Sequence, residues 1–339
     1  MNILVTGNTG YIGSVLVPFL KNKYPSYNLY GFDNNYFIKC LIEKSKPEIY
    51  LKKQIKEDIR KSNFDFLKKN NIKTVVHLAG LSNDPIGNID TKITHNINTS
   101  SSIKLINKSV KYKIENFVFA SSCSIYGKSD KKIINENNIL NPLTPYAKSK
   151  IDIEKYINNI FKNETKFTKL RFATACGSSP RLRLDLVLND FVTSAFLSKK
   201  ILLLSDGKAW RPLIDVHDMC RAIDWAIHRS NKEKYNNLSI NVGSNSNNLT
   251  IFNLAKKVSR IIPNTKVVKI NNAQKDKRSY KVDFGLFRRM AKGYLPIMTL
   301  DRSIKNIYAQ VKKINFKDKD FRESSLIRLK YLKKLQKHK

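Results

Sequence analysis

The sequence predicts an α/β protein: a doubly wound parallel sheet followed by a smaller C-terminal α/β region. Short apolar runs rich in β-branched residues alternate with helical stretches through the first half of the chain, a pattern typical of a parallel sheet with helices on both faces. The first apolar run leads directly into a glycine-rich turn. After Arg171 the alternation gives way to shorter, less regular elements. With 339 residues, the chain can hold a full hydrophobic core.

Each expected strand is a short apolar run, and each expected helix has apolar residues at helical spacing. The strands expected in the sheet are 2–5, 29–33, 48–51, 73–80, 116–120, 167–172 and 239–243. The helices around them are one beginning at Ser14, then 62–70, 90–111, 146–161 and 216–229. The smaller region is expected to contain a helix at 185–199, a strand at 201–204, and two further elements at 249–262 and 266–270.

These elements divide the chain into two interleaved regions. Residues 1–175 form a nucleotide-binding domain to which 212–243 return, and residues 176–211 and 244–311 form the smaller, substrate-binding region. Residues 312–339 carry 11 Lys/Arg against 3 Asp/Glu and are expected to form a solvated basic helix or tail. Because the chain passes between the two regions, we expect a cleft between them.

The glycine-rich turn, Thr6-Gly7-Asn8-Thr9-Gly10-Tyr11-Ile12-Gly13, joins the first strand to the first helix. Gly7 permits the tight turn, Gly10 lets the backbone approach a diphosphate, and Gly13 lets the helix pack closely on the strand. The helix N-terminus offers free N–H groups to an anion. The spacing therefore predicts a Rossmann-type dinucleotide site, although glycines at this spacing also occur in ordinary turns.

Asp33 ends the second expected strand, about 20 residues beyond the turn. A carboxylate at this position accepts hydrogen bonds from the adenosine ribose and repels a 2′-phosphate, which favours NAD over NADP. The alternative is a plain turn or N-cap residue. Further along, Ala79 and Gly80 end the 73–80 strand with small residues, as a backbone passing close to the cofactor requires.

Composition excludes some other classes of protein. The net charge of +36 comes mostly from lysines spread along the chain, which favours a solvated basic surface over nucleic-acid binding, although its field would attract an anionic substrate. No apolar run approaches the roughly 20 residues of a membrane span. The cysteines, Cys40, Cys123, Cys176 and Cys220, are scattered, so we expect a reduced, cytoplasmic protein without a metal site.

Tyr146 and Lys150 carry the expected chemistry. Four residues apart, they share one face of a helix. A lysine ammonium one turn from a phenol stabilises the phenolate, which can then act as a base. Ser122, at the end of the 116–120 strand, could donate a hydrogen bond to the reacting oxygen. The alternative is an exposed helix face, since two such residues at this spacing are common by chance.

Together these motifs make the chain similar to extended short-chain dehydrogenases/reductases, in the NAD-dependent nucleotide-sugar epimerase/dehydratase family. The resemblance implies that Ser122, Tyr146 and Lys150 are catalytic. It implies a bound NAD contacted by Gly7, Gly10, Tyr11, Ile12, Gly13, Asp33, Asp58, Ile59, Leu78, Ala79, Gly80, Tyr146 and Lys150. It further implies a nucleotide-diphosphate sugar held by Ser122, Asn189, Arg211 and Arg278, and a homodimer built from the helices of 90–111 and 146–161.

The residues after Ser122 bear on which reaction of the family is catalysed. Sugar 4,6-dehydratases have an acidic pair there, whereas this chain has Cys123 and Ser124, neither of which is a carboxylic acid. We therefore expect a nucleotide-sugar 4-epimerase resembling UDP-glucose 4-epimerase. The alternatives are an NAD(P)H-dependent reductase of 4-keto sugars, a dehydratase, and a non-catalytic NAD- or RNA-binding protein. Ala173-Thr174 departs from the epimerase pattern, so the sugar and nucleotide stay open.

Overall fold

The computed structural model describes residues 1–41, 46–128, 133–160, 164–230, 236–270 and 278–337. Its centre is a seven-stranded, fully parallel sheet in the order β10-β6-β5-β4-β1-β2-β3. The strands are β1 (Asn2–Thr6), β2 (Asn28–Phe32), β3 (Lys53–Ile55), β4 (Thr74–His77), β5 (Asn116–Ser122), β6 (Lys166–Phe172) and β10 (Asn237–Val242). The strand order reverses between β1 and β4, where a parallel sheet opens a crevice for ligands. The expected doubly wound sheet is confirmed.

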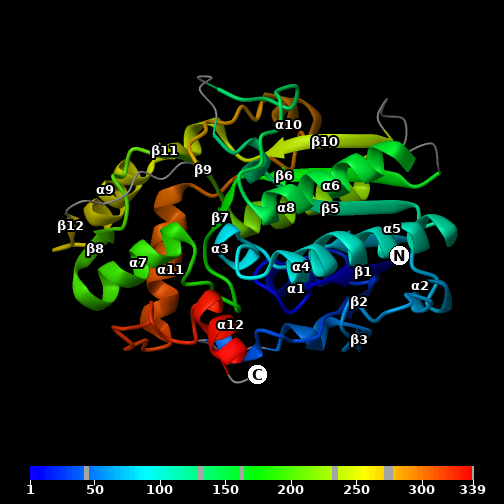
Figure 1. The fold of residues 1–339 in the computed structure, drawn as a ribbon, viewed down its shortest axis with the longest axis horizontal. Helices are drawn as coiled ribbons and strands as arrows, with labels where there is room; N and C mark the ends of the chain where they lie inside the picture. The colour runs from blue at the N-terminus through cyan, green and yellow to red at the C-terminus, as the bar shows by residue number, and fades with distance from the viewer. Residues whose placement is uncertain (42–45, 129–132, 161–163, 231–235, 271–277, 338–339) are drawn as a thin grey trace.

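Helices cover both faces of this sheet (Figure 1). Helices α1 (Gly13–Lys23) and α8 (Val216–His228) share one buried apolar cluster with alternate strand residues such as Ile3 and Val76. Helices α5 (Ser101–Lys111) and α6 (Pro145–Ile160) share a second cluster that includes Leu4 and Val75. Successive strand residues therefore enter opposite layers, and both faces of the sheet are buried.

The smaller region has its own core (Figure 1). Strands β7 (Thr174–Cys176), β9 (Trp210–Asp215) and β11 (Asn248–Thr250) form one sheet, and β8 (Lys200–Leu203) pairs with β12 (Lys266–Lys269) in another. Helices α7 (Val187–Ser198), α9 (Ile251–Ile261) and α11 (Leu300–Lys313) pack together beside them. The short α10 (Gly285–Met290) lies near β10. Within the described residues, no helix combines the length and apolar character that crossing a bilayer requires.

Several local predictions differ from the structure. The expected strand 48–51 is a 3₁₀ turn, η2 (Pro47–Tyr50), and the third strand is β3. A proline at the start of a segment favours a helical turn. The helix expected at 62–70 is only α2 (Phe66–Lys69), because the side chains of Ser62 and Asn63 accept hydrogen bonds from backbone N–H groups and hold a turn before it.

The long helix expected at 90–111 is present in three parts. They are α4 (Thr91–His95), a π-helical turn η3 (Asn96–Ser100) and α5. A further short helix, α3 (Asp84–Gly87), follows β4, with the side chain of Asn83 accepting a hydrogen bond from the N–H of Ile86. Both features lie beside the cavity described next.

The C-terminal segment is docked rather than fully solvated. Phe321 is only 2% exposed, and Arg322 forms an ion pair of 2.5 Å with Asp190 on α7. The final helix, α12 (Arg328–Lys337), lies where the sheet and the smaller region meet (Figure 1) and contacts α3. The expected solvated tail is therefore wrong for residues 321–332, although the expected helix is present.

Candidate active site

A cavity of about 1260 Å³ opens at the carboxyl ends of the sheet strands and extends to the smaller region. It is lined by the glycine-rich turn, by the residues after β2, β4 and β5, and by the first turns of α6. Ligands bind at this edge of a parallel sheet, at the point where the strand order reverses. The structure therefore brings the predicted cofactor and catalytic residues to one place.

The glycine-rich turn fits a dinucleotide diphosphate. Gly7 has a φ of +72°, and a Cβ there would lie 2.7 Å from the backbone nitrogen of Ala79. A Cβ on Gly13 would lie 2.5 Å from Cα of Asn8, so the close approach of helix and turn requires glycine. No side chain caps the N-terminus of α1, and its first turn has no acidic residue. An anion can therefore approach these N–H groups from the cavity.

Asp33 lies at the cavity surface after β2. Its carboxylate accepts hydrogen bonds from the N–H of Asn35 at 2.8 Å and of Thr9 at 3.3 Å, which fixes it beside the glycine-rich turn. Asp58 also lines the cavity, where its ion pair of 2.6 Å with Arg60 lowers the pKa of the carboxyl. The remaining expected cofactor contacts on the cavity wall are Gly10, Tyr11, Ile12, Ile59, Leu78, Ala79 and Gly80.

Ser122, Tyr146 and Lys150 converge on the cavity from β5 and α6. Ser122 is hydrogen-bonded to the Tyr146 phenol, and this bond lowers the pKa of the tyrosine. The N–H of Ser124 donates to Oγ of Ser122 at 3.1 Å, which leaves the hydroxyl proton of Ser122 available to donate. Nζ of Lys150 donates to the carbonyl of Ala120 at 2.7 Å and lies 5.6 Å from the centroid of the Tyr146 ring.

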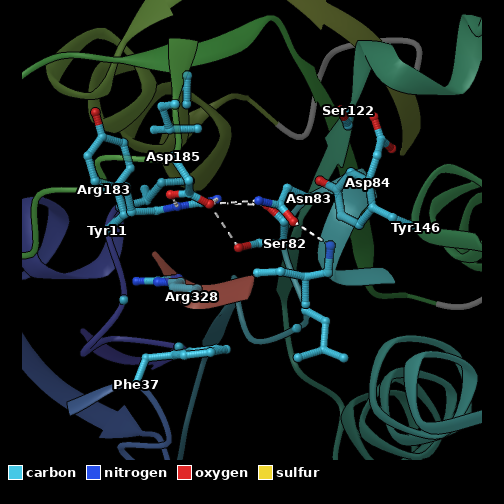
Figure 2. Close-up of a pocket in the computed structure, with 18 of the residues that line it drawn as sticks. Tyr11, Phe37, Ser82, Asn83, Asp84, Ser122, Tyr146, Arg183, Asp185 and Arg328 are labelled. Carbon is cyan, nitrogen blue, oxygen red and sulfur yellow. Dashed lines mark hydrogen bonds and ion pairs between the residues drawn. The ribbon is translucent and has the colours of Figure 1, made fainter. Parts of the chain in front are cut away.

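Burial shifts both titrating groups toward their neutral forms. Burial and, to a smaller extent, the nearby carboxylate of Asp84 raise the pKa of Tyr146 to about 12, whereas Ser122 and Arg183 oppose the shift. Burial also lowers the pKa of Lys150 to about 8. The two pKa values therefore move apart: the phenol holds its proton more tightly than a free tyrosine, and the ammonium releases its proton more easily than a free lysine. Figure 2 shows Tyr146, Ser122 and Asp84 near one another at one end of the cavity.

Two charged pairs in the cavity were not predicted from the sequence. The carboxylate of Asp84 accepts a hydrogen bond of 2.6 Å from Thr144 and an ion pair of 2.7 Å from Arg278. Arg183 forms a two-pronged ion pair with Asp185, at 2.6 and 2.9 Å (Figure 2). Polar side chains after a strand end and three charges in Arg181-Leu182-Arg183-Leu184-Asp185 are signals that could have found both pairs.

The residues expected to bind the substrate diphosphate differ in position. Arg211 and Arg278 line the cavity. Arg211 is held over the Tyr280 ring, 5.5 Å from its centroid, and donates to the carbonyl of Trp210 at 2.8 Å. Asn189 is fully buried and does not line the cavity. Its side chain accepts from the N–H of Gly177 and donates to the backbone carbonyl of Arg183, so the structure argues against its expected contact with substrate.

Comparison with known proteins agrees with this site. The model of the NAD dependent epimerase/dehydratase family matches residues 3–243. The chain therefore belongs to the NAD dependent epimerase/dehydratase family, and its cofactor is NAD. An uncharacterized UDP-glucose epimerase of Bacillus subtilis is 29% identical over 240 residues, which are 66% of this chain and 71% of that protein.

Two solved structures show the shared fold. UDP-glucose 4-epimerase of Thermotoga maritima, solved with UDP-glucose, superposes with a TM-score of 0.78 at 24% identity, over 92% of this chain and 99% of the other. An NAD-dependent NDP-hexosamine 5,6-dehydratase of tunicamycin biosynthesis superposes with a TM-score of 0.80 at 18% identity, over 94% and 99%. The chain is thus similar in fold to enzymes that catalyse two different reactions.

Proposed function

We propose that the protein is a nucleotide-sugar 4-epimerase. The observation that carries the proposal is the meeting of Ser122, Tyr146 and Lys150 in the cavity that holds the dinucleotide-binding turn. Sugar-nucleotide epimerases are also among the relatives, as the B. subtilis protein illustrates.

The side chains support a reversible proton transfer at one hydroxyl of the sugar. Tyr146 removes the proton of the 4-hydroxyl, Ser122 donates a hydrogen bond to the same oxygen, and the ammonium of Lys150 stabilises the phenolate. NAD, which the glycine-rich turn and Asp33 would hold, would supply the hydride-transfer chemistry at C4 of the sugar. Tyr146 then returns the proton to the oxygen, so the reaction has no net consumption of cofactor.

The two positions after Ser122 favour epimerisation over elimination of water. Cys123 is 1% exposed and its thiol donates to the carbonyl of Arg171 at 3.1 Å, and burial raises its pKa well above the usual range for a thiol. Ser124 lines the cavity, but a hydroxyl is a poor acid. Neither residue can deliver the proton that a departing hydroxyl needs.

Incubation with nucleotide sugars and no added cofactor tests the proposal. We expect the purified protein, loaded with NAD, to convert UDP-glucose or a related nucleotide sugar into its 4-epimer, detected by chromatography, without accumulation of NADH at 340 nm. Tyr146→Phe should lower turnover by about 10²- to 10⁴-fold and leave NAD binding intact. Accumulation of NADH in proportion to product would exclude the epimerase and favour the keto-sugar reductase, and a 4-keto-6-deoxy product would identify a dehydratase.

We also infer a homodimer built on the α4–α5 run and α6. Ile93 and Leu143 expose 39% and 45% of their surface beside these helices, and burying them against a second copy would be favourable. Light scattering should give twice the chain mass at micromolar concentration. A monomer alone would contradict the inference.

A further inference from the structure

Helix α12 places a cationic side chain, that of Arg328, at the wall of the cavity. Arg328, its first residue, lines the cavity together with Leu332. The preceding segment is held in place by buried Phe321 and Ile327 and by the ion pair of Arg322 with Asp190. The position of Arg328 is therefore determined by packing over some ten residues and is not that of a loose end.

The guanidinium of Arg328 is buried, and no carboxylate among the described residues is hydrogen-bonded to it. Arg328 is 9% exposed, and its guanidinium carbon lies over the face of the Phe37 ring, 4.7 Å from the centroid. Within the described residues, its guanidinium makes no hydrogen bond and no ion pair. Figure 2 shows this side chain between Phe37 and the Arg183–Asp185 pair, in the open part of the cavity.

The two carboxylates near Arg328, Asp185 and Asp33, are engaged by other groups. Arg183 already occupies both oxygens of Asp185, and Asp33 is engaged by two backbone N–H groups. Burial and the charge of Arg183 lower the pKa of Arg328 to about 10, so the guanidinium remains protonated at neutral pH. A buried, unpaired charge costs several kcal/mol, and an anion entering the cavity would relieve that cost.

We propose that Arg328 is a cofactor ligand whose guanidinium binds the diphosphate of NAD, so that α12 closes over the bound dinucleotide. Guanidinium matches phosphate oxygens with two parallel hydrogen bonds. The diphosphate of a nucleotide sugar has the same chemistry, but Arg328 lies on the side of Phe37, Cys40 and Asp33, and Asp33 is the residue expected at the adenosine ribose. The inference depends on NAD binding and not on the proposed sugar chemistry, so each can fail alone.

Calorimetric titration of cofactor-free protein tests the proposal. In Arg328→Gln we expect the dissociation constants of NAD and ADP to rise about 10- to 100-fold, the loss of one charge-assisted hydrogen-bonded contact. Binding of adenosine, which lacks a diphosphate, should not change, and neither should binding of UDP. Lys333→Gln, the same change of charge at an exposed position of α12, is the matched control and should bind NAD like the wild type.

Thermal unfolding separates ligand binding from a structural role. Without ligand, Arg328→Gln should melt no lower than the wild type, because it removes an unpaired buried charge, whereas the rise in melting temperature caused by NAD should shrink. A lower melting temperature without ligand would assign Arg328 to folding and overturn the proposal. It is also overturned if NAD binding changes less than twofold, if NAD binds more tightly, or if UDP binding is lost in its place.

Discussion

Nη1 of Arg278 lies 2.7 Å from Oδ2 of Asp84, so an arginine expected to hold the substrate diphosphate is paired with a carboxylate near Tyr146. Thr144, two residues before Tyr146, donates to the other oxygen of the same carboxylate at 2.6 Å. Substrate binding at Arg278 and the proton affinity of Tyr146 are therefore connected through one side chain.

The first prediction concerns this carboxylate. Asp84→Asn removes a negative charge that raises the pKa of Tyr146, so the pKa should fall. With the phenolate as the base, as proposed above, activity should rise as pH increases through that pKa, and a lower pKa should move the acidic limb of the kcat/KM profile to lower pH. Asp84→Glu keeps the charge and should leave the limb in place. An unshifted limb in Asp84→Asn would disprove the coupling.

The ammonium of Lys150 should lower the free energy of unfolding at neutral pH. Its pKa is about 8 in the folded protein against 10.5 in the unfolded chain. Below pH 8 the folded protein therefore holds a charged ammonium in a buried site, which lowers its stability. This loss of stability disappears as the pH rises from 8 to 10.5, because the folded protein then releases the proton and the unfolded chain keeps it. Cofactor-free Lys150→Met should be more stable than the wild type at pH 7, by on the order of 2 kcal/mol, yet lose turnover.

Urea unfolding of that variant at pH 7 and pH 10 measures the effect. The exposed Lys148→Met, on the same helix, is the control and should show no such dependence on pH. If the stability difference of Lys150→Met were the same at both pH values, the lowered pKa would be refuted.

The buried pair of Arg171 and Glu154 should matter for folding. Nη2 of Arg171 lies 2.7 Å from Oε2 of Glu154, and both side chains are at most 7% exposed. Arg171→Met leaves the carboxylate buried without its partner and should cost about 3–5 kcal/mol in urea unfolding. The double variant Arg171→Met/Glu154→Leu should recover most of that loss. A double variant as unstable as the single one would show that packing, and not the unpaired charge, is responsible.

Asp33 should set the choice of cofactor. Replacing it with Ser removes the charge that repels a 2′-phosphate, so the ratio of NADP to NAD affinity should increase at least about tenfold, equivalent to 1.4 kcal/mol. Calorimetric titration with both dinucleotides measures the ratio. Asp58→Asn, which removes a carboxylate already neutralised by Arg60, should leave it unchanged, and an equal effect in both variants would contradict the role given to Asp33.

The predictable parts of the molecule depend on short-range spacing. The glycine turn, Asp33 after β2, and the Tyr146–Lys150 pair follow from residues at most one strand or one helical turn apart, and the parallel sheet follows from alternating elements. Features made by distant segments were not predictable. Arg328 enters the cavity of the N-terminal domain from the C-terminal helix, and no local pattern distinguishes it from the surface lysines around it.

Asn189 illustrates the converse error. The resemblance to the family implied a substrate contact. Instead, the side-chain amide of Asn189 is hydrogen-bonded to the N–H of Gly177, to the carbonyl of Arg183 and, at 3.4 Å, to the hydroxyl of Tyr11. A polar residue at the start of a helix can serve the backbone as readily as a ligand. Only the tertiary arrangement decides between the two roles.

The Tyr11 hydroxyl donates a hydrogen bond of 2.7 Å to the carbonyl of Gly177. This bond links the glycine-rich turn to the smaller region. Buried hydrogen bonds between two regions resist a hinge motion of one region relative to the other. In the proposed epimerisation, the keto sugar would therefore turn over within the width of a rigid cavity, without the two regions moving apart. The same rigidity would restrain the escape of the keto sugar into water.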